Sequence, residues 1–545
     1  MAVLVSLMVI AASSPLVALL LRAAWVTLSC YWLTPMRIRR AMAAQGVRGP
    51  PPRPLVGNLR EVSALVARAT ADDMPSLSHD IVGRLMPHYV LWSGTYGKLF
   101  VYLYGSEPRL CLTDTALIKE FLSSKYAHAT GKSWLQRQGT KHFIGGGLLM
   151  ANGARWAHQR HVVAPAFMAD KLKARGRVGR MVECTKQAIR ELRDAAAGRR
   201  GEEVEIGAHM TRLTGDIISR TEFKHQLRHR QAHLPPPRAP PAPHLPLQPP
   251  SLDPRQPVSP PTPSPPPETT VHYEREIRRL NGELEAVLME SIRRSREIAD
   301  EGRAAVATYG RGLLAMLMSE MEEKEKNGGG GGGEFSYDAQ LVIDECKTFF
   351  FAGHETSALL LTWAIMLLAT NPAWQEKART EVAAVCGDHP PSADHLSKLT
   401  VLQMIIQETL RLYPPATLLP RMAFEDIQLG GLRLPRGLSV WIPVLAIHHD
   451  ESIWGPDAHE FRPERFAPGA RRPSAAGAAR FLPFAAGPRN CVGQAYALVE
   501  AKVVLAMLLS AFRFAISDNY RHAPENVLTL RPKHGVPVHL RPLRP

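Results

Sequence analysis

The sequence has few cysteines and no cysteine pair. Only six occur in 545 residues, and they lie far apart, with no Cys-x-x-Cys spacing. A zinc site or a disulfide scaffold needs paired or clustered cysteines, so neither is expected. Isolated cysteines instead favour a protein of a reducing compartment. They are Cys30, Cys111, Cys184, Cys346, Cys386 and Cys491.

Acidic residues are also in short supply. Asp and Glu number 50 against 66 Lys and Arg, which gives a net charge of +16. The basic residues are spread along the chain and no nucleic-acid-binding motif accompanies them, so nucleic acid is not expected as a partner. A basic surface facing anionic lipid and an acidic redox partner fits the charge better.

The N-terminus lacks the basic residues that open a secretory signal. Residues 2–21 are apolar and uncharged, and the apolar character resumes after Arg22 through Leu33. About 20 apolar residues span a bilayer. A cleaved signal peptide is the alternative, but the run is long for one. We therefore predict a transmembrane anchor over 1–33. The basic cluster after it, Arg37, Arg39 and Arg40, predicts a cytosolic C-terminal side.

Proline then sets a boundary. The run GPPPRP at 49–54 forbids continued helix and favours an extended hinge, which we place at 34–57 together with the basic cluster. The remaining residues, 58–545, predict a single large domain, since 45% of the chain is apolar and can supply a core.

The secondary-structure pattern is mainly α with small β-sheets. Residues 97–113 read as two strands around a turn at Gly105-Ser106, and from about 114 the pattern is mostly helical. A long apolar run without proline, 338–369, predicts a buried central helix. A second helix is expected at 398–412, before Pro414-Pro415, and short β-like pieces follow at 427–445 and 527–541.

Cys491 has a setting that the other five cysteines lack. Gly487 and Gly493 permit a tight backbone turn and close approach to a flat ligand. The apolar run 496–509 predicts a helix that begins just after the sulfur, and backbone amides at its start would stabilise a thiolate. Phe484 could shield the sulfur from water, and Arg489 could pair with a carboxylate. A cysteine thiolate in such a loop is suited to ligate haem iron.

The segment is the Phe-x-x-Gly-x-Arg-x-Cys-x-Gly signature of the cytochrome P450 family, which the chain resembles. Four further motifs occur in that family's order. They are Trp156-Ala-His-Gln-Arg160, Ala352-Gly353-His354-Glu355-Thr356, Glu408-Thr-Leu-Arg411 and Pro463-Glu464-Arg465-Phe466. Each short match is weak alone, but five in order are specific. The resemblance implies a cytochrome P450 fold, with one haem domain behind the anchor. It also implies haem b ligated by Cys491, and NADPH acting only through a cytochrome reductase.

The same resemblance assigns roles to the motif residues. Trp156 and Arg160 are expected to meet a haem propionate, with Arg421 as a further candidate. Gly353 would open a groove for dioxygen on the central helix, and Thr356 and Glu355 would donate or relay protons. The alternative for these two is a threonine bonded to its own helix backbone and a glutamate on a solvated face.

Two polar groups are assigned to structure instead of chemistry. Glu408 and Arg411 are i, i+3 neighbours on a helix and are expected to form a buried triad with Arg465. His448-His449-Asp450 could suggest a metal site, but adjacent residues of an extended segment point to opposite faces, so they are expected to be loop residues.

Several longer segments resemble one plant subfamily, the cytokinin hydroxylases. The resemblance implies hydroxylation of the prenyl side chain of isopentenyladenine-type cytokinins to trans-zeatin types, on the endoplasmic reticulum membrane. Alternatives are a hydroxylase of another plant hormone, such as a gibberellin or brassinosteroid, a haem-thiolate isomerase or dehydratase, and an impaired product. The segments are residues 73–82, 131–153, 349–369, 410–427 and 514–530.

Two stretches depart from this pattern. Residues 327–333 (NGGGGGG) predict a flexible loop. Residues 224–274 should form helices that roof the substrate pocket, yet 17 prolines fall within 235–267 and exclude helix. One explanation is a stretch read in a shifted frame, which transcript sequencing would test. The other is a real disordered insert, which would leave the pocket without its roof.

Overall fold

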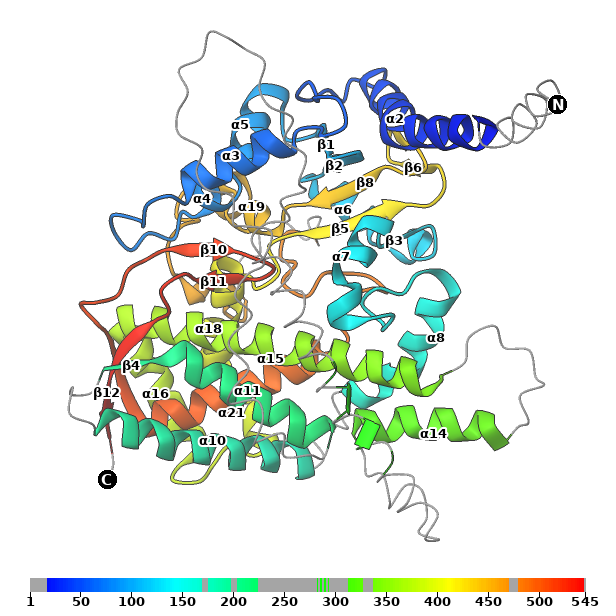
Figure 1. Cartoon of the computed structure of the whole chain (residues 1–545). Helices are drawn as coiled ribbons and strands as arrows, with labels where there is room; N and C mark the ends of the chain where they lie inside the picture. Colours follow the sequence, from blue (N-terminus) through cyan, green and yellow to red (C-terminus); the bar gives the residue numbers. More distant parts are fainter. Residues whose placement is uncertain are drawn as a thin grey trace, which may run out of the picture.

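A computed structural model describes residues 17–168, 175–197, 203–223, 312–326, 337–469 and 479–543, with a few helical positions between 282 and 293. Within these ranges the chain is mostly helical with small sheets, as the sequence predicts (Figure 1). The first sixteen residues, the proline-rich segment 224–274 and the glycine-rich loop 327–333 lie outside the described residues.

The principal helices are α2 (Thr34–Ala43), α3 (Leu59–Ala69), α4 (Val82–Leu85), α5 (Pro87–Tyr96), α6 (Thr115–Phe121), α7 (Trp134–Ile144), α8 (Gly153–Val163), α10 (Arg175–Ala196), α11 (Ile206–Glu222), α14 (Leu313–Lys326), α15 (Ala339–Thr370), α16 (Pro372–Cys386), α17 (Ala393–Leu396), α18 (Thr400–Leu412), α19 (Val444–His448), α20 (Glu451–Trp454) and α21 (Gln494–Ala511). The strands are β1 (Phe100–Tyr104), β2 (Glu107–Cys111), β3 (Thr130–Gly131), β4 (Glu203–Glu205), β5 (Leu419–Ala423), β6 (Ile427–Leu429), β7 (Leu432–Leu434), β8 (Ser439–Ile442), β9 (Phe512–Ile516), β10 (Pro524–Asn526), β11 (Leu530–Pro532) and β12 (Pro537–Pro542).

The predicted central helix is α15, which crosses the middle of the molecule (Figure 1). The Asp338 side chain caps its start by accepting from the Leu341 amide at 2.7 Å, and Asn371-Pro372 ends it. Helices α10, α11 and α21 pack with α15 into a bundle. Most side chains of α15 are buried, but Phe350–Thr356 are less so, and Ala352 is exposed. This short stretch is therefore where the helix faces open space.

A five-stranded sheet lies on the other side of the molecule, with strand order β1-β2-β8-β5-β3. The two strands predicted within 97–113 are confirmed as β1 and β2, which pair antiparallel with Tyr104 opposite Glu107. A three-stranded sheet, β4-β12-β9, packs beside the bundle near the end of α15, and two small hairpins complete the β-structure.

The N-terminal apolar segment forms a helix over Val17–Ala43, and none of its most apolar window is buried in the protein. It is long and apolar enough to cross a membrane, as are α15 and α21, but the windows of those two are mostly buried inside the fold. The exposed N-terminal helix thus fits a membrane anchor.

The predicted hinge is only partly extended. Residues 34–43, the basic part of the predicted hinge, continue the N-terminal helix as α2. Helix α2 ends at Ala43, and the proline run that begins at Pro50 lies in non-helical chain. Arg39 donates to the carbonyls of Gly49 and Pro50, while the Val101 amide of β1 donates to the Arg48 carbonyl. The hinge is therefore fastened to the sheet.

A buried carboxyl links two bundle helices and predicts a pH dependence. Glu500 on α21 accepts a 2.7 Å bond from Ser357 on α15, and burial raises the pKa of Glu500 to about 8. Because the folded protein holds a proton that the unfolded chain releases above pH about 4.5, stability should fall as pH rises between these values. The slope is about 1.4 kcal/mol per pH unit for one carboxyl.

Replacing Glu500 with glutamine should therefore make the free energy of unfolding depend less on pH. The variant should gain most in stability over the wild type near pH 8. Urea unfolding of both proteins at pH 6, 7 and 8 measures this. Equal slopes for the two proteins would argue that Glu500 is charged in the folded state.

Candidate active site

The loop Phe484–Gly493 holds Cys491 immediately before α21. Gly487 has φ +71°, and a Cβ there would lie 1.7 Å from the Leu122 carbonyl oxygen, so glycine is required. The Cys491 amide donates to the Phe484 carbonyl at 2.9 Å and closes the turn. The loop therefore leaves Cys491 with solvent-exposed surface, although enough protein surrounds the sulfur to penalise its charged form, whereas Cys111, Cys184, Cys346 and Cys386 are buried.

Opposing effects set the pKa of Cys491. The Gly493 amide and Arg160 act to lower its pKa, as expected, but burial outweighs them and raises the pKa above that of an ordinary thiol. The predicted stabilisation of the thiolate by a backbone amide is present, but the penalty of burial is larger. A bound cation would have to displace the proton, as metals do when they bind cysteine.

Arg160 supports the cysteine loop directly. Its guanidinium donates to the Asn490 carbonyl at 2.6 Å and to the Asn490 side-chain oxygen at 2.7 Å. Its predicted contact with a propionate stays a prediction, because both described bonds go to the loop next to the sulfur.

Arg489 lies over the Trp156 ring, 4.4 Å from its centroid, and donates to the Ala151 carbonyl. No carboxylate of the described residues pairs with Arg489, so its predicted pairing with a carboxylate stays a prediction. Its Nε is buried and has no hydrogen-bond partner among the described residues. A buried cation with an unsatisfied donor is a place for an anionic ligand.

Two further cations gather near Arg489. Burial and mutual repulsion lower the pKa of Lys132 well below its ordinary value, with Arg421 and Arg489 as the charges responsible. Burial lowers the pKa of Arg421 to about 10 and that of Arg489 to about 9. No acidic side chain contributes to any of the three shifts. This cluster is short of negative charge and fits the two propionates of a haem.

Lys132 was not among the predicted site residues. It follows β3, while Arg421 lies on β5 and Arg489 precedes Cys491, so three distant segments meet here. A lone lysine after a short strand carries no local signal of this role.

The central-helix motif makes mainly local contacts. The Thr356 hydroxyl donates to the Ala352 carbonyl at 2.7 Å, which is the alternative considered for it. Glu355 is not on a solvated face, since its Oε1 accepts from Thr529 at 3.0 Å and lies 3.5 Å from Arg531. The motif thus sits at the less buried stretch of α15 with Glu355 held in place.

Gly353 has a different role from the one predicted. A Cβ at this position would meet Ile218 of α11 at 3.1 Å, so the glycine faces a neighbouring helix. The prediction that it opens a groove for dioxygen is wrong. Its lack of a side chain lets α11 approach α15 closely.

The structural triad is confirmed. Arg411 donates to both oxygens of Glu408 at 2.7 Å, and Arg465 lies 3.5 Å from Glu408. Glu408 and Arg411 are fully buried. His448 ends α19 and is not the predicted loop residue, whereas His449 and Asp450 lie in the connection that follows, and both histidines are buried. His448 accepts from the Leu482 amide, which ties α19 to the segment before the cysteine loop.

Comparison with known proteins agrees with this geometry. The family model for cytochrome P450 matches residues 82–537. A cytokinin hydroxylase of Arabidopsis thaliana is 53% identical, over 97% of both chains, and a second from the same plant is 51% identical over 96% of both. Cytochrome P450 734A6 of Oryza sativa subsp. japonica is 35% identical over 95% of this chain and 94% of its own.

Proposed function

This chain belongs to the cytochrome P450 family of haem-thiolate monooxygenases, and we propose that it hydroxylates the prenyl side chain of isopentenyladenine-type cytokinins to trans-zeatin types. The proposed substrate rests on sequence identity. The chain is 53% and 51% identical, over nearly its whole length, to two proteins named cytokinin hydroxylase. The more distant plant relatives are 34–37% identical.

The haem, when bound, activates dioxygen with electrons from a reductase and supplies one oxygen atom to the substrate. In our proposal Cys491 ligates the iron, and Gly493 lets the backbone pass close to it. Phe484 packs at the edge of the core and keeps water from the sulfur. Arg489, Arg421 and Lys132 hold the propionates, with Trp156 beneath Arg489 and Arg160 fixing the loop.

Thr356 and Glu355 are proposed to deliver protons on the substrate side. Thr356 presents its hydroxyl beside the Ala352 carbonyl, within the less buried stretch 350–356 of α15. Glu355 is held by Thr529 and Arg531 and can exchange protons with groups outside the helix.

Replacing Thr356 with alanine tests this role. Product formation is expected to fall by about 10²-fold, a typical loss for a positioned proton donor, while reductant consumption continues. The measurement is product formed per NADPH consumed, with Thr370→Ala as control. Thr370 also donates to its own helix backbone, at the Met366 carbonyl, but lies at the end of α15. If both variants formed the same amount of product per NADPH consumed, Thr356 would have no role in proton delivery.

The substrate assignment is tested with the holoprotein and a plant cytochrome reductase. We expect isopentenyladenine, its riboside or its ribotide to give a trans-hydroxylated product that depends on NADPH. Gibberellin and brassinosteroid precursors, assayed in parallel, test the other hormone classes. Consumption of a peroxide without reductant would indicate an isomerase or dehydratase. No hydroxylated cytokinin from confirmed holoprotein would defeat the proposal.

We propose that the anchor holds the enzyme in the endoplasmic reticulum membrane with the haem domain in the cytosol. The basic residues Arg37, Arg39 and Arg40 lie at the end of the apolar helix, where positive charge favours the cytosolic side. Protease added to sealed microsomes should then digest the haem domain. Protection of that domain would reverse the proposed orientation.

A further inference from the structure

The N-terminal helix is joined to the β6–β7 hairpin by side-chain bonds. Gln45, just after α2, donates from its side-chain amide to the Arg433 carbonyl of β7 at 2.9 Å and accepts from the Arg433 amide at 2.7 Å. The two residues are 388 positions apart in the sequence. A side-chain amide that bonds both backbone groups of one residue fixes two segments in one relative position. The hairpin is therefore held against the end of the helix.

Apolar packing strengthens this joint. Ile38 and Met42, about one turn apart on α2, are buried. They belong to the same core cluster as Leu434 of β7 and Leu438, which follows it. The Cβ position of Gly437 lies 3.5 Å from the Ile38 side chain, which is ordinary van der Waals contact. The end of the helix is therefore packed into the domain, and the two form one body.

The packed end is continuous with the proposed anchor. Val17–Ala43 form one helix of 27 residues, which includes a π-helical turn over Ser29–Leu33. At 1.5 Å per residue this helix is about 40 Å long. Because one end is fixed in the domain, the path of the helix through a bilayer determines which face of the domain meets the membrane.

The membrane surface can be located along this helix. Arg37 is the first charged residue after the apolar run that ends at Leu33, so the headgroup layer begins near it. From Arg37 to the end of α2 the helix rises about 9 Å. The headgroup layer is roughly 5–8 Å thick on each side of a bilayer. Gln45 and the hairpin that it holds therefore lie at about the level of the headgroups.

The start of the hairpin also lies near α2. Asp426, the residue before β6, accepts from the Arg436 amide at 2.9 Å and from the Arg433 side chain at 2.8 Å. These bonds lower the pKa of Asp426, and the charge of Arg37 lowers it further. Glu425, the neighbouring carboxylate, is exposed. Arg37 is therefore within electrostatic range of the hairpin, and α2 and the hairpin share one face.

Four arginines of this face are exposed. Arg37 and Arg40 are i, i+3 neighbours on α2, Arg433 belongs to β7, and Arg436 follows that strand. The Arg433 side chain is 71% exposed although it forms an ion pair. A guanidinium has five N–H donors, so one ion pair leaves donors for a second anion. We call these four residues and the hairpin the headgroup surface.

We propose that the headgroup surface binds the headgroups of anionic phospholipids in the bilayer that the N-terminal helix crosses. This inference rests on the proposed membrane anchoring. Arginine forks match the oxygens of phosphate and carboxylate groups and can bind them in pairs. An anionic leaflet attracts basic residues that adjoin a membrane helix. The joint at Gln45 makes the contact specific, because it holds the hairpin at the depth where headgroups lie.

The test uses full-length holoenzyme in nanodiscs of phosphatidylcholine, with or without phosphatidylserine. Phenylglyoxal modifies accessible arginines, and mass spectrometry gives the rate at each site. Arg433 and Arg436 should react about fivefold more slowly in the anionic nanodiscs, the factor for one basic residue at an anionic surface. High chloride concentration should remove the difference, because salt screens exposed charges. Equal rates in the two kinds of nanodisc would overturn the proposal.

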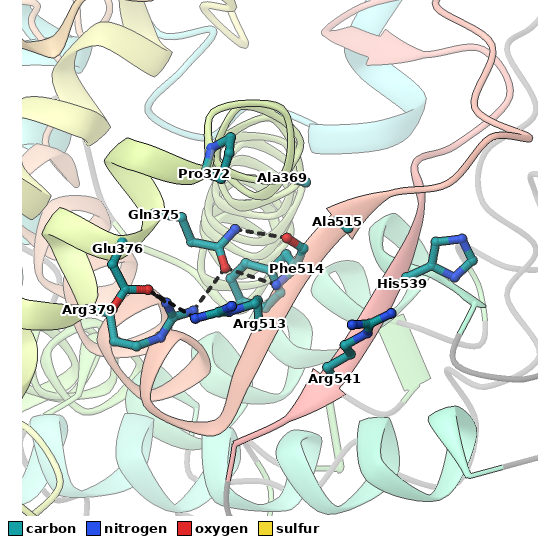
Figure 2. Close-up of a pocket in the computed structure, with 10 residues that line it drawn as sticks. All are labelled: Ala369, Pro372, Gln375, Glu376, Arg379, Arg513, Phe514, Ala515, His539 and Arg541. Carbon is teal, nitrogen blue, oxygen red and sulfur yellow. Dashed lines mark hydrogen bonds and ion pairs between the residues drawn. The ribbon is translucent and has the colours of Figure 1, made fainter.

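Arg513 serves as the control arginine within the same protein. Like Arg433 it is exposed and paired with one carboxylate, Glu376, at 3.4 Å, and Figure 2 shows the two side chains beside α16. It lies on β9, whose partner strand β12 is at the opposite end of the molecule from α2 (Figure 1). Its rate should be the same in both kinds of nanodisc. A fall at Arg513 equal to that at Arg433 would show general shielding and contradict the proposal.

Gln45→Ala tests whether the joint positions the hairpin. Gln45 is exposed and far in sequence from the proposed haem site, so the variant should still fold and bind haem. Its hairpin arginines should lose most of their protection by phosphatidylserine. The matched control is Gln187→Ala, since Gln187 also bonds through its side chain on an exposed helix surface, to Glu191 of α10, and it should keep full protection. Full protection in Gln45→Ala would show that the joint does not direct this face to the lipid.

Carbonate extraction separates failure of this proposal from failure of the proposed anchoring. Release of the protein from membranes by carbonate would mean that the N-terminal helix does not insert, and both proposals would fall. Retained protein whose hairpin arginines are unprotected would overturn the headgroup surface alone. Protection that appears only after cytochrome reductase is added would assign this face to the reductase and likewise overturn the proposal.

Discussion

Cys491→Ser is expected to abolish both the haem-thiolate spectrum and the hydroxylation activity. Removing a residue that only hydrogen-bonds to a metal ligand lowers metal affinity or activity by about 10–100-fold. Removing the ligand itself should therefore lower haem affinity or activity by more than about 100-fold. Serine is a poor substitute because its hydroxyl is far less acidic than a thiol. The position has no alternative sulfur, since the remaining described cysteines are buried elsewhere or lie in the N-terminal helix.

The measurement is the carbon-monoxide difference spectrum of the reduced protein, together with haem content per polypeptide. The shift that marks a thiolate ligand should be absent in Cys491→Ser. Cys30→Ser is the control, because Cys30 is exposed on the N-terminal helix and should retain both spectrum and activity. A normal thiolate spectrum in Cys491→Ser would show that another residue binds the iron.

The central helix and the cysteine loop could be predicted because their signals are local. A run of 32 residues without proline, mostly apolar, has few other conformations available, and it appears as α15. Gly487 was expected to allow a tight turn, and its positive φ beside the Leu122 carbonyl confirms this. Such features depend on neighbours in the chain, which the sequence displays directly.

Features that depend on distant contacts were predicted only in part, since Arg421 and Arg489 were expected to bind the haem but Lys132 was not. Lys132, Arg421 and Arg489 come from three segments, and only the folded chain reveals that they share one charge-poor environment. Gly353 is next to the proposed catalytic residues, yet the position that a Cβ would take there faces Ile218. The direction of a helical residue depends on which helix packs where, and periodicity alone does not determine that.

The direction of the pKa shift of Cys491 also depends on distant contacts. Helix amides and a cation do act on the sulfur, but burial opposes them and its extent is a property of the whole fold. The basic segment after the anchor continues the apolar helix as α2, which ends at Ala43, before the proline-rich run at 49–54.

Removing Arg411 is expected to cost about 3–5 kcal/mol of folding free energy, the usual result of breaking a buried ion pair. Arg411→Met would leave the Glu408 carboxylate buried beside only Arg465, at 3.5 Å. It would also leave three carbonyls, those of His448, Ala458 and Glu460, without their donor. Since domains are stable by only about 5–15 kcal/mol, little haem-loaded protein should remain.

The matched control is Lys186→Gln. Lys186 and Glu183 form an ion pair at the same i, i+3 spacing, but on the exposed face of α10, where such pairs contribute at most about 1 kcal/mol. Urea unfolding and haem content are measured for both variants. The double variant Glu408→Leu/Arg411→Met should recover part of the loss, because it removes the unpaired charge. If Arg411→Met were as stable as Lys186→Gln, the triad would not hold this part of the fold together, and the link from α18 through His448 to the cysteine loop would have to be abandoned.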